Sequence, residues 1–155
     1  MEPTQDPVKH LTQRVLGFLA IRIRSRQELK TYLEDKTNDQ QVIDQVLLYL
    51  DMHKLIDDKE FARAWAESRL RKLKGDLFIR LELRQRGISD SLITEAIHNI
   101  SADDWNAAVK NCLAKYEHKW KSLTGYLQKA KIYTLLNQRG FSATHIDGFL
   151  KSRVE

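Results

Sequence analysis

The sequence has little proline, glycine or cysteine, and each shortage excludes a class of structure. Both prolines lie within the first seven of the 155 residues, and only six glycines occur. Because proline and glycine interrupt helices, a chain with so few of them favours helix. The single cysteine, Cys112, excludes an internal disulfide, which fits a reducing compartment.

Long apolar runs are also missing. No stretch approaches the roughly 18 apolar residues that span a bilayer, and no basic segment followed by an apolar run marks a secretory signal at the start. We therefore expect a cytoplasmic protein without membrane contact. Hydrophobic residues make up 42% of the chain and charged residues 30%, which is too apolar for a disordered protein.

Apolar residues recur at helical spacing in nine segments. Gly75 opens the fifth segment and Gly87 ends it, and Gly140 ends the eighth, as glycine often does beyond a helix C-terminus. Most of the remaining segments begin with a residue type that caps helices, and these caps are Asp6, Ser25, Asn38, Asp57, Ser89, Ser101 and Ser142. Ser25 with Glu28 has the pattern of a capping box.

The nine segments form three groups that repeat one pattern. The pattern aligns Leu29 with Ile79 and Ile132, Leu33 with Leu83 and Leu136, and Thr37 with Gly87 and Gly140. The third copy is three residues longer, and we place the extra residues in the polar link 117–124. A unit of about 50 residues has a small core, so neighbouring units should stack. We predict an all-α fold of three tandem three-helix repeats, over 7–56, 57–100 and 101–152, in an elongated, curved array.

No catalytic or metal-binding pattern is visible. The chain lacks GxxxxGK[ST] and GxGxxG, and its five histidines are scattered, so we expect no cofactor, no metal and no enzyme activity. The acid pairs 57–58 and 103–104 fall where helices begin and are explained by capping. Cys112, Trp65 and Trp105 lie on apolar stripes and indicate core, whereas Trp120, between two lysines, fits either core or a contact role.

Basic residues are the remaining functional candidates. Net charge is +5, and residues 61–88 alone carry eight basic and three acidic groups. Residues 105–131 form a second basic segment. Such clusters fit phosphate contacts, an acidic protein surface or a merely solvated helix face, and the sequence leaves these open. Our candidate partner-binding or DNA-binding residues are Arg22, Arg24, Arg71, Lys72, Lys74, Arg80, Arg84 and Arg86.

Four segments together resemble the RecX family. They read LGFLAIRIRSRQELKTYLEDK, LIDDKEFARAWAESRLRK, KGDLFIRLELRQRGIS and KAKIYTLLNQRGFSATHI, and the resemblance extends from about residue 8 to 152. The family often has a glycine in the first unit's turn, where this chain has Lys36-Thr37-Asn38.

The resemblance implies a regulator without catalytic residues. RecX proteins bind RecA, notably its filament on single-stranded DNA, and modulate, mainly by inhibition, its ATPase, strand-exchange and coprotease activities in DNA repair and the SOS response. We expect a monomer that binds RecA, with DNA itself as a second partner. The alternative is a general DNA-binding protein built from helix-turn-helix-like units, which predicts salt-sensitive DNA binding without RecA.

Overall fold

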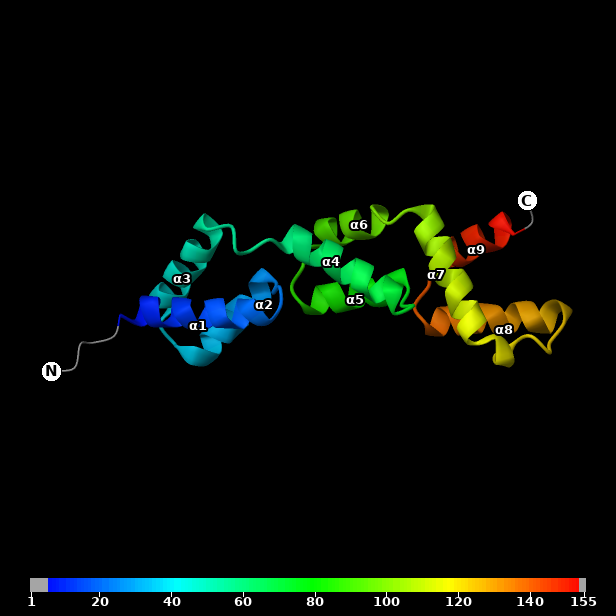
Figure 1. The fold of residues 1–155 in the computed structure, drawn as a ribbon, viewed down its shortest axis with the longest axis horizontal. Coiled ribbons are helices and arrows are strands. Elements are labelled where there is room, and N and C mark those ends of the chain that lie inside the picture. Colours follow the sequence, from blue (N-terminus) through cyan, green and yellow to red (C-terminus); the bar gives the residue numbers. More distant parts are fainter. Residues whose placement is uncertain (1–5, 154–155) are drawn as a thin grey trace.

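A computed structural model describes residues 6–153, which form nine α-helices, one short 3-10 helix (η1) and no strand. The helices group in threes along a row (Figure 1). Unit 1 contains α1 (Pro7–Ile21), α2 (Arg26–Lys36) and α3 (Gln40–Met52). Unit 2 contains α4 (Asp58–Arg71), α5 (Asp76–Gln85) and α6 (Asp90–His98). Unit 3 contains α7 (Ala102–Lys115), η1 (Glu117–Lys119), α8 (Gly125–Gln138) and α9 (Ala143–Ser152).

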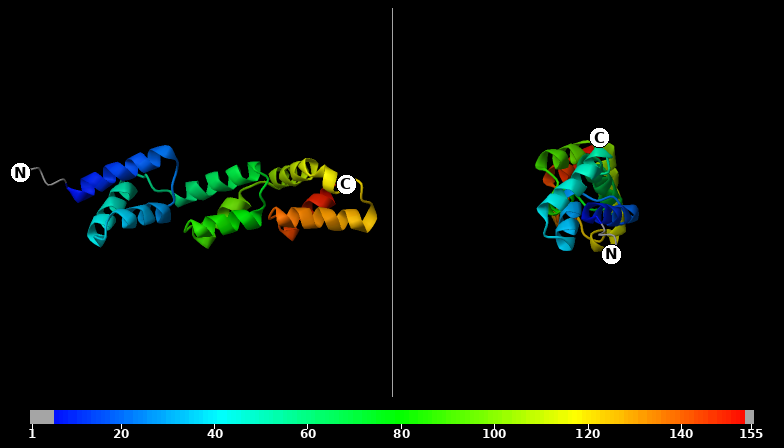
Figure 2. Two further views of the ribbon diagram at one scale, coloured as in Figure 1. Left: turned by 90° about the horizontal axis from the view of Figure 1, so that it is seen from below. Right: turned by 90° about the vertical axis from the view of Figure 1, so that its left-hand side faces the viewer.

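The described part of the chain is elongated, with α1 and α9 toward opposite ends. Seen from below, α1, α4 and α7 follow one another along one edge of the row, and α2, α5 and α8 along the other (Figure 2). This arrangement confirms the predicted all-α array of three-helix repeats. The exact division at residues 57 and 101 stays a prediction. Among residues 6–153 no helix is long and apolar enough to cross a membrane.

Side-chain caps begin most of the helices at the predicted residues. Ser25 accepts a hydrogen bond from the backbone N of Glu28, and the Glu28 carboxylate accepts one from the backbone N of Ser25, which completes the capping box. The prediction for α3 was wrong by one residue, because Asp39 rather than Asn38 accepts from the first free backbone N–H groups. Ser142 stands at the predicted N-cap position of α9 but makes no capping hydrogen bond.

Apolar packing divides the array unequally. Unit 1 has its own core, in which Val15, Leu29, Leu33 and Leu50 are fully buried. Units 2 and 3 share a single core, which runs from Phe61 in α4 to Phe149 in α9. Units 2 and 3 therefore form one body by apolar burial, whereas no hydrophobic cluster of the described residues joins unit 1 to unit 2.

The joint between units 2 and 3 is a direct backbone contact. The turn after α8 lies against the start of α5, where Gly75 N donates to Arg139 O and Leu77 N donates to Gly140 O, both at 2.8 Å. The buried Asp76 carboxylate accepts from Ser142 N at 2.9 Å. The first two bonds satisfy backbone N–H groups at the N-terminus of α5 that the helix itself leaves free, and the third satisfies the N–H of Ser142 before α9.

The joint between units 1 and 2 has the same layout but uses side chains. The turn after α5 lies against the start of α2, where the Ser25 hydroxyl donates to Arg86 O at 2.7 Å. Arg26 N donates to the Asp58 carboxylate at 2.8 Å, and Arg86 Nε lies 3.5 Å from Glu28 Oε1. Unit 1 is thus held to unit 2 by polar and ionic contacts.

The turns after the middle helices differ as their residues suggest. Gly87 and Gly140 have φ of +75° and +85°, a left-handed conformation that glycine adopts without strain. Thr37, which stands where the RecX family often has glycine, caps α2 in an extended conformation with φ of −152°. The extra length of unit 3 lies only partly in the predicted link, which contains η1. The rest lengthens α8 to 14 residues, against 11 in α2 and 10 in α5.

Candidate partner-binding surface

Four of the eight predicted contact residues form ion pairs within the chain. Arg22 and Arg86 both face Glu28, with N···O distances of 2.8 and 3.5 Å. Lys74 lies 3.0 Å from Glu82, and Arg84 lies 3.0 Å from Asp90. These cations neutralise carboxylates of their own chain, which lowers the charge that they offer to a partner.

Trp65 is the centre of a polar cluster on unit 2. Its indole Nε1 donates to Glu82 Oε2 at 2.8 Å, and Arg69 Nε lies 2.7 Å from the same oxygen. The guanidinium carbons of Arg86 and Arg69 lie 3.9 and 4.4 Å from the centroid of the Trp65 ring, as in cation–π contacts. Trp65 also packs on the core, as predicted, but its polar edge and ring hold three charged side chains in place.

Two carboxylates in these clusters have lowered pKa values. Burial opposes the charged form of Glu28, but the hydrogen bonds from Arg22 and Ser25 N and the charges of Arg22 and Arg86 outweigh it, so that its pKa is lowered. Burial likewise favours a higher pKa for Glu82. The hydrogen bonds from Lys74 and Trp65 and the charges of the nearby cations outweigh burial, so the pKa of Glu82 lies below its ordinary value. Both groups are therefore ionised at neutral pH and hold the cations around them.

The other four predicted contact residues have no carboxylate partner within residues 6–153. Arg71 and Lys72 are exposed at the end of α4. Arg80 donates only to the hydroxyl of Thr94, at 3.3 Å. Arg24 covers the ring of Phe18 at 3.7 Å, and its pKa is lowered by burial and by the charge of Arg22. Arg71, Lys72 and Arg80 thus keep their charge available on the surface of unit 2.

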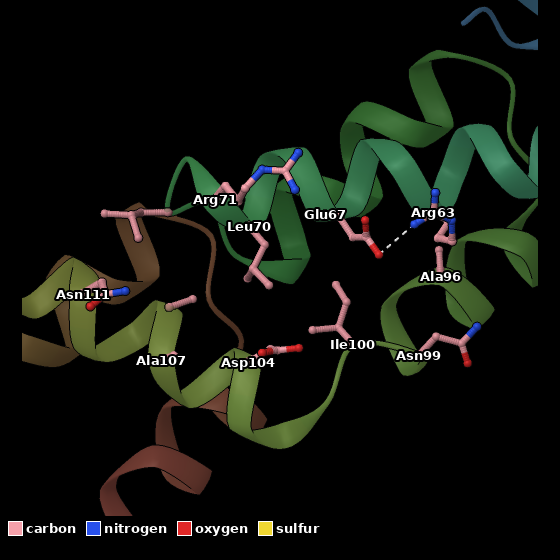
Figure 3. A pocket seen from close by; sticks show the side chains of 12 residues that line it. Arg63, Glu67, Leu70, Arg71, Ala96, Asn99, Ile100, Asp104, Ala107 and Asn111 are labelled. Atoms are coloured by element: carbon pink, nitrogen blue, oxygen red, sulfur yellow. Dashed lines mark ion pairs between the residues drawn. The ribbon is translucent and has the colours of Figure 1, made fainter.

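A groove of about 790 Å³ lies on the surface between α4, α6 and α7, with Arg71 among its lining residues (Figure 3). Leu70 of α4 and Ile100 before α7 project into it, and Arg63 pairs with Glu67 at 2.9 Å on its wall (Figure 3). Its remaining lining residues are Leu73, Ala96, Asn99, Asp104, Ala107, Ala108 and Asn111. No sequence pattern singled out this groove, because its walls come from helices that meet only when the units stack.

The reactive and acidic side chains considered in the sequence occupy structural positions. Cys112 is buried, as predicted, and burial raises the pKa of its thiol, which makes it a weak nucleophile. No group of three His, Cys, Asp or Glu side chains between residues 6 and 153 could hold a metal ion. The acid pairs stand at the starts of α4 and α7, where Asp57 accepts from Glu60 N as a cap.

Comparison with known proteins identifies the family. Residues 13–50 match the model of the first three-helix domain of RecX, and residues 57–97 match that of the second. The chain is 35% identical over 149 residues to the regulatory protein RecX of Chlorobium phaeobacteroides, and covers 93% of that protein. The chain belongs to the RecX family. The regulatory protein RecX of Prosthecochloris aestuarii is also 35% identical, with 86% of each chain covered.

Solved RecX structures have the same fold. A crystal structure of RecX from Lactobacillus salivarius superposes with a TM-score of 0.79 at 22% identity, over 95% of this chain and 96% of that one. A crystal structure of regulatory protein RecX gives 0.80 at 23% identity, over 96% of this chain and 75% of that one. Some RecX relatives are longer, and this chain spans about half the length of those from Geobacillus, with 55% and 51% covered.

Proposed function

We propose that this protein binds the RecA filament on single-stranded DNA and restrains its ATPase, strand-exchange and coprotease activities during DNA repair and the SOS response. The observation that carries the proposal is membership of the RecX family, whose relatives are named as regulatory proteins. In this proposal the protein is a cytoplasmic monomer and does no chemistry of its own. Size-exclusion chromatography with light scattering checks the monomer.

The shape of the described chain supports this mode of action. Three units in a row present a long surface, so that successive units can contact successive subunits of a helical polymer (Figure 2). Linked weak contacts raise overall affinity, because each later contact forms within one complex. A regulator of this kind needs no large interface on any single subunit.

Within the proposal, the unpaired cations of unit 2 are the first contacts to test. Arg71, Lys72 and Arg80 have no carboxylate partner in residues 6–153, whereas Arg22, Lys74, Arg84 and Arg86 also position their own chain. Unpaired cations at a rim raise association rates with an acidic or phosphate-bearing partner. The eight residues remain the proposed contact set, with these three as the strongest members.

Charge reversal with a matched control tests the proposal. The Arg71→Glu, Lys72→Glu double variant should lose inhibition of RecA-dependent ATP hydrolysis on single-stranded DNA by roughly 10-fold in half-maximal concentration. The Lys9→Glu, Arg14→Glu variant makes the same change of charge on α1, at the far end of the array, and should keep most of its inhibition. Equal losses in both variants would mean that only net charge matters, and no inhibition by the parent protein would refute the proposal.

Direct DNA binding is the second candidate, because unit 3 has a large excess of basic residues. It predicts that filter binding of single-stranded DNA without RecA is tight and falls steeply between low and physiological salt. Negligible affinity at physiological salt, together with intact inhibition of RecA, would exclude it and favour contact with the filament protein.

A further inference from the structure

Unit 3 contains a second, smaller hollow, between α7, α9 and the link that carries η1. Its volume is about 370 Å³. Leu113 and Phe149, both nearly buried in the shared core, form its floor, and Trp120 forms a wall. Lys110, Ala114 and Arg153 lie at its rim, where all three side chains are exposed.

The apolar wall is held in a fixed position. The Trp120 indole N–H donates to Leu113 O at 3.0 Å, and Gln128 donates to Trp120 O at 3.4 Å. The single hydrogen-bonding group of the indole is therefore used within the chain. The hollow consequently offers apolar contact on its walls and leaves hydrogen bonding to its rim.

The charged residues that line the hollow are two cations, Lys110 and Arg153, and one carboxylate, Glu117. Lys110 and Arg153 form no ion pair within residues 6–153, and the Arg153 guanidinium carbon lies 5.7 Å from the centroid of the Phe149 ring. The one lining carboxylate, Glu117, pairs with Lys121 at 3.1 Å. The described residues of unit 3, 102–153, contain nine lysines and arginines and four acidic residues. The field of unit 3 therefore attracts anionic ligands.

We propose that this hollow binds an acidic peptide segment of a partner protein. One aromatic or large aliphatic side chain enters between Leu113, Trp120 and Phe149, and carboxylates on either side of it meet Lys110 and Arg153. A buried apolar anchor with a charged rim is the usual composition of a short-peptide site. This inference stands apart from the proposed function, since peptide binding at unit 3 requires no recombinase.

A nucleic acid fits the same hollow less well. Base edges are read by free donors and acceptors, but the indole N–H is already bonded and the floor is hydrocarbon. An acidic peptide instead brings both the apolar group that the floor needs and the negative charge that the rim attracts.

Fluorescence anisotropy with a labelled peptide tests the inference on the full-length protein. The probe is an acidic peptide with one central phenylalanine flanked by aspartates, and we expect it to bind more weakly as salt rises. The same peptide with glycine in place of phenylalanine should bind at least 10-fold more weakly, because the anchor is lost. In a two-dimensional NMR spectrum, the indole N–H signal of Trp120 should shift on binding, and that of Trp65 should not.

Two variants locate the site. Ala114→Trp fills the hollow from its exposed rim, and Ala107→Trp makes the same change two turns earlier on α7, outside the hollow. We expect at least a 10-fold loss of peptide affinity for Ala114→Trp and little change for Ala107→Trp. The double variant Lys110→Glu, Arg153→Glu should lose binding without filling the hollow, so a folding defect in Ala114→Trp cannot explain both results.

Three outcomes overturn the inference. The first is absence of peptide binding to the parent protein. The second is an equal loss in Ala107→Trp, which indicates non-specific attraction. The third is competition with the peptide by an oligothymidylate strand whose own binding is lost in Ala114→Trp, because that result would mean that the hollow binds nucleic acid. Failure of RecA inhibition would leave this result unaffected, because the assay contains no RecA.

Discussion

Replacing Gly75 by alanine tests how closely units 2 and 3 are fitted together. A Cβ at this position would lie 2.2 Å from the backbone C of Gly140 and the backbone N of Phe141. The obstacle is backbone, so no side-chain rotation relieves it. The φ of Gly75 is −81°, which alanine adopts without strain. Any loss of stability in Gly75→Ala therefore measures the contact between the two units.

The expected cost follows from two contributions. Forcing a methyl group into a packed contact costs about 1–3 kcal/mol. The two backbone hydrogen bonds of the joint, from Gly75 N and Leu77 N, contribute about 1 kcal/mol each and are lost when the units separate. The free energy of unfolding should fall by about 3–5 kcal/mol, which lowers the Tm of a chain of this size by about 10 °C or more.

Urea and thermal unfolding followed by circular dichroism provide the measurement. Gly17→Ala and Gly148→Ala are matched controls, because neither Cβ meets any atom within 4 Å and both positions lie inside helices. Each control should gain about 0.5–1 kcal/mol from the higher helix propensity of alanine. A Gly75→Ala protein as stable as these controls would refute the close fit of the joint.

Three further predictions concern other parts of the array. Ser25→Ala should loosen unit 1 without melting units 2 and 3, so that spin-label distances between units 1 and 2 broaden, and more so at high salt. The pKa of His145 lies below 6.5, because burial and the charge of Arg80 lower it by more than the charge of Asp76 raises it. The unfolded chain therefore takes up a proton at His145 more readily than the folded chain, and the free energy of unfolding falls as pH drops below 6.5. In His145→Gln this decrease should be smaller. The thiol of Cys112 should react with a disulfide reagent far more slowly in native protein than in urea, because burial raises its pKa.

The repeat was predictable from sequence because it rests on local spacing. Leu29, Ile79 and Ile132 occupy equivalent positions on the middle helices, and all three are buried. The cap at Ser25 was predictable for the same reason, since a capping box involves residues three apart. Asn38 and Asp39 are both good caps, and only the structure shows that Asp39 is used.

The pairing of the basic residues could not be predicted in this way. Arg86 meets Glu28 across 58 residues of chain, so no local pattern connects them. From the sequence we predicted that four of these cations contact a partner, whereas in the structure each forms an ion pair with a carboxylate of its own chain. They are Arg22, Lys74, Arg84 and Arg86. For Trp120 the sequence left two roles open, a core residue or a contact residue. In the structure Trp120 is half-buried beside the hollow of unit 3, and its indole N–H donates to Leu113 O.

The two joints differ at one equivalent position of the repeat. At the start of α5, Gly75 has no side chain, so its own N–H reaches the Arg139 carbonyl. At the start of α2, Ser25 reaches the equivalent carbonyl, that of Arg86, with its hydroxyl group instead. At this first joint ion pairs, among them Arg86 with Glu28, surround the hydroxyl contact, and no hydrophobic cluster of the described residues crosses it. We therefore expect the residue that precedes the middle helix to influence how closely neighbouring units join, since Gly75 gives a direct backbone contact beside a shared core and Ser25 a side-chain contact beside ion pairs that salt weakens.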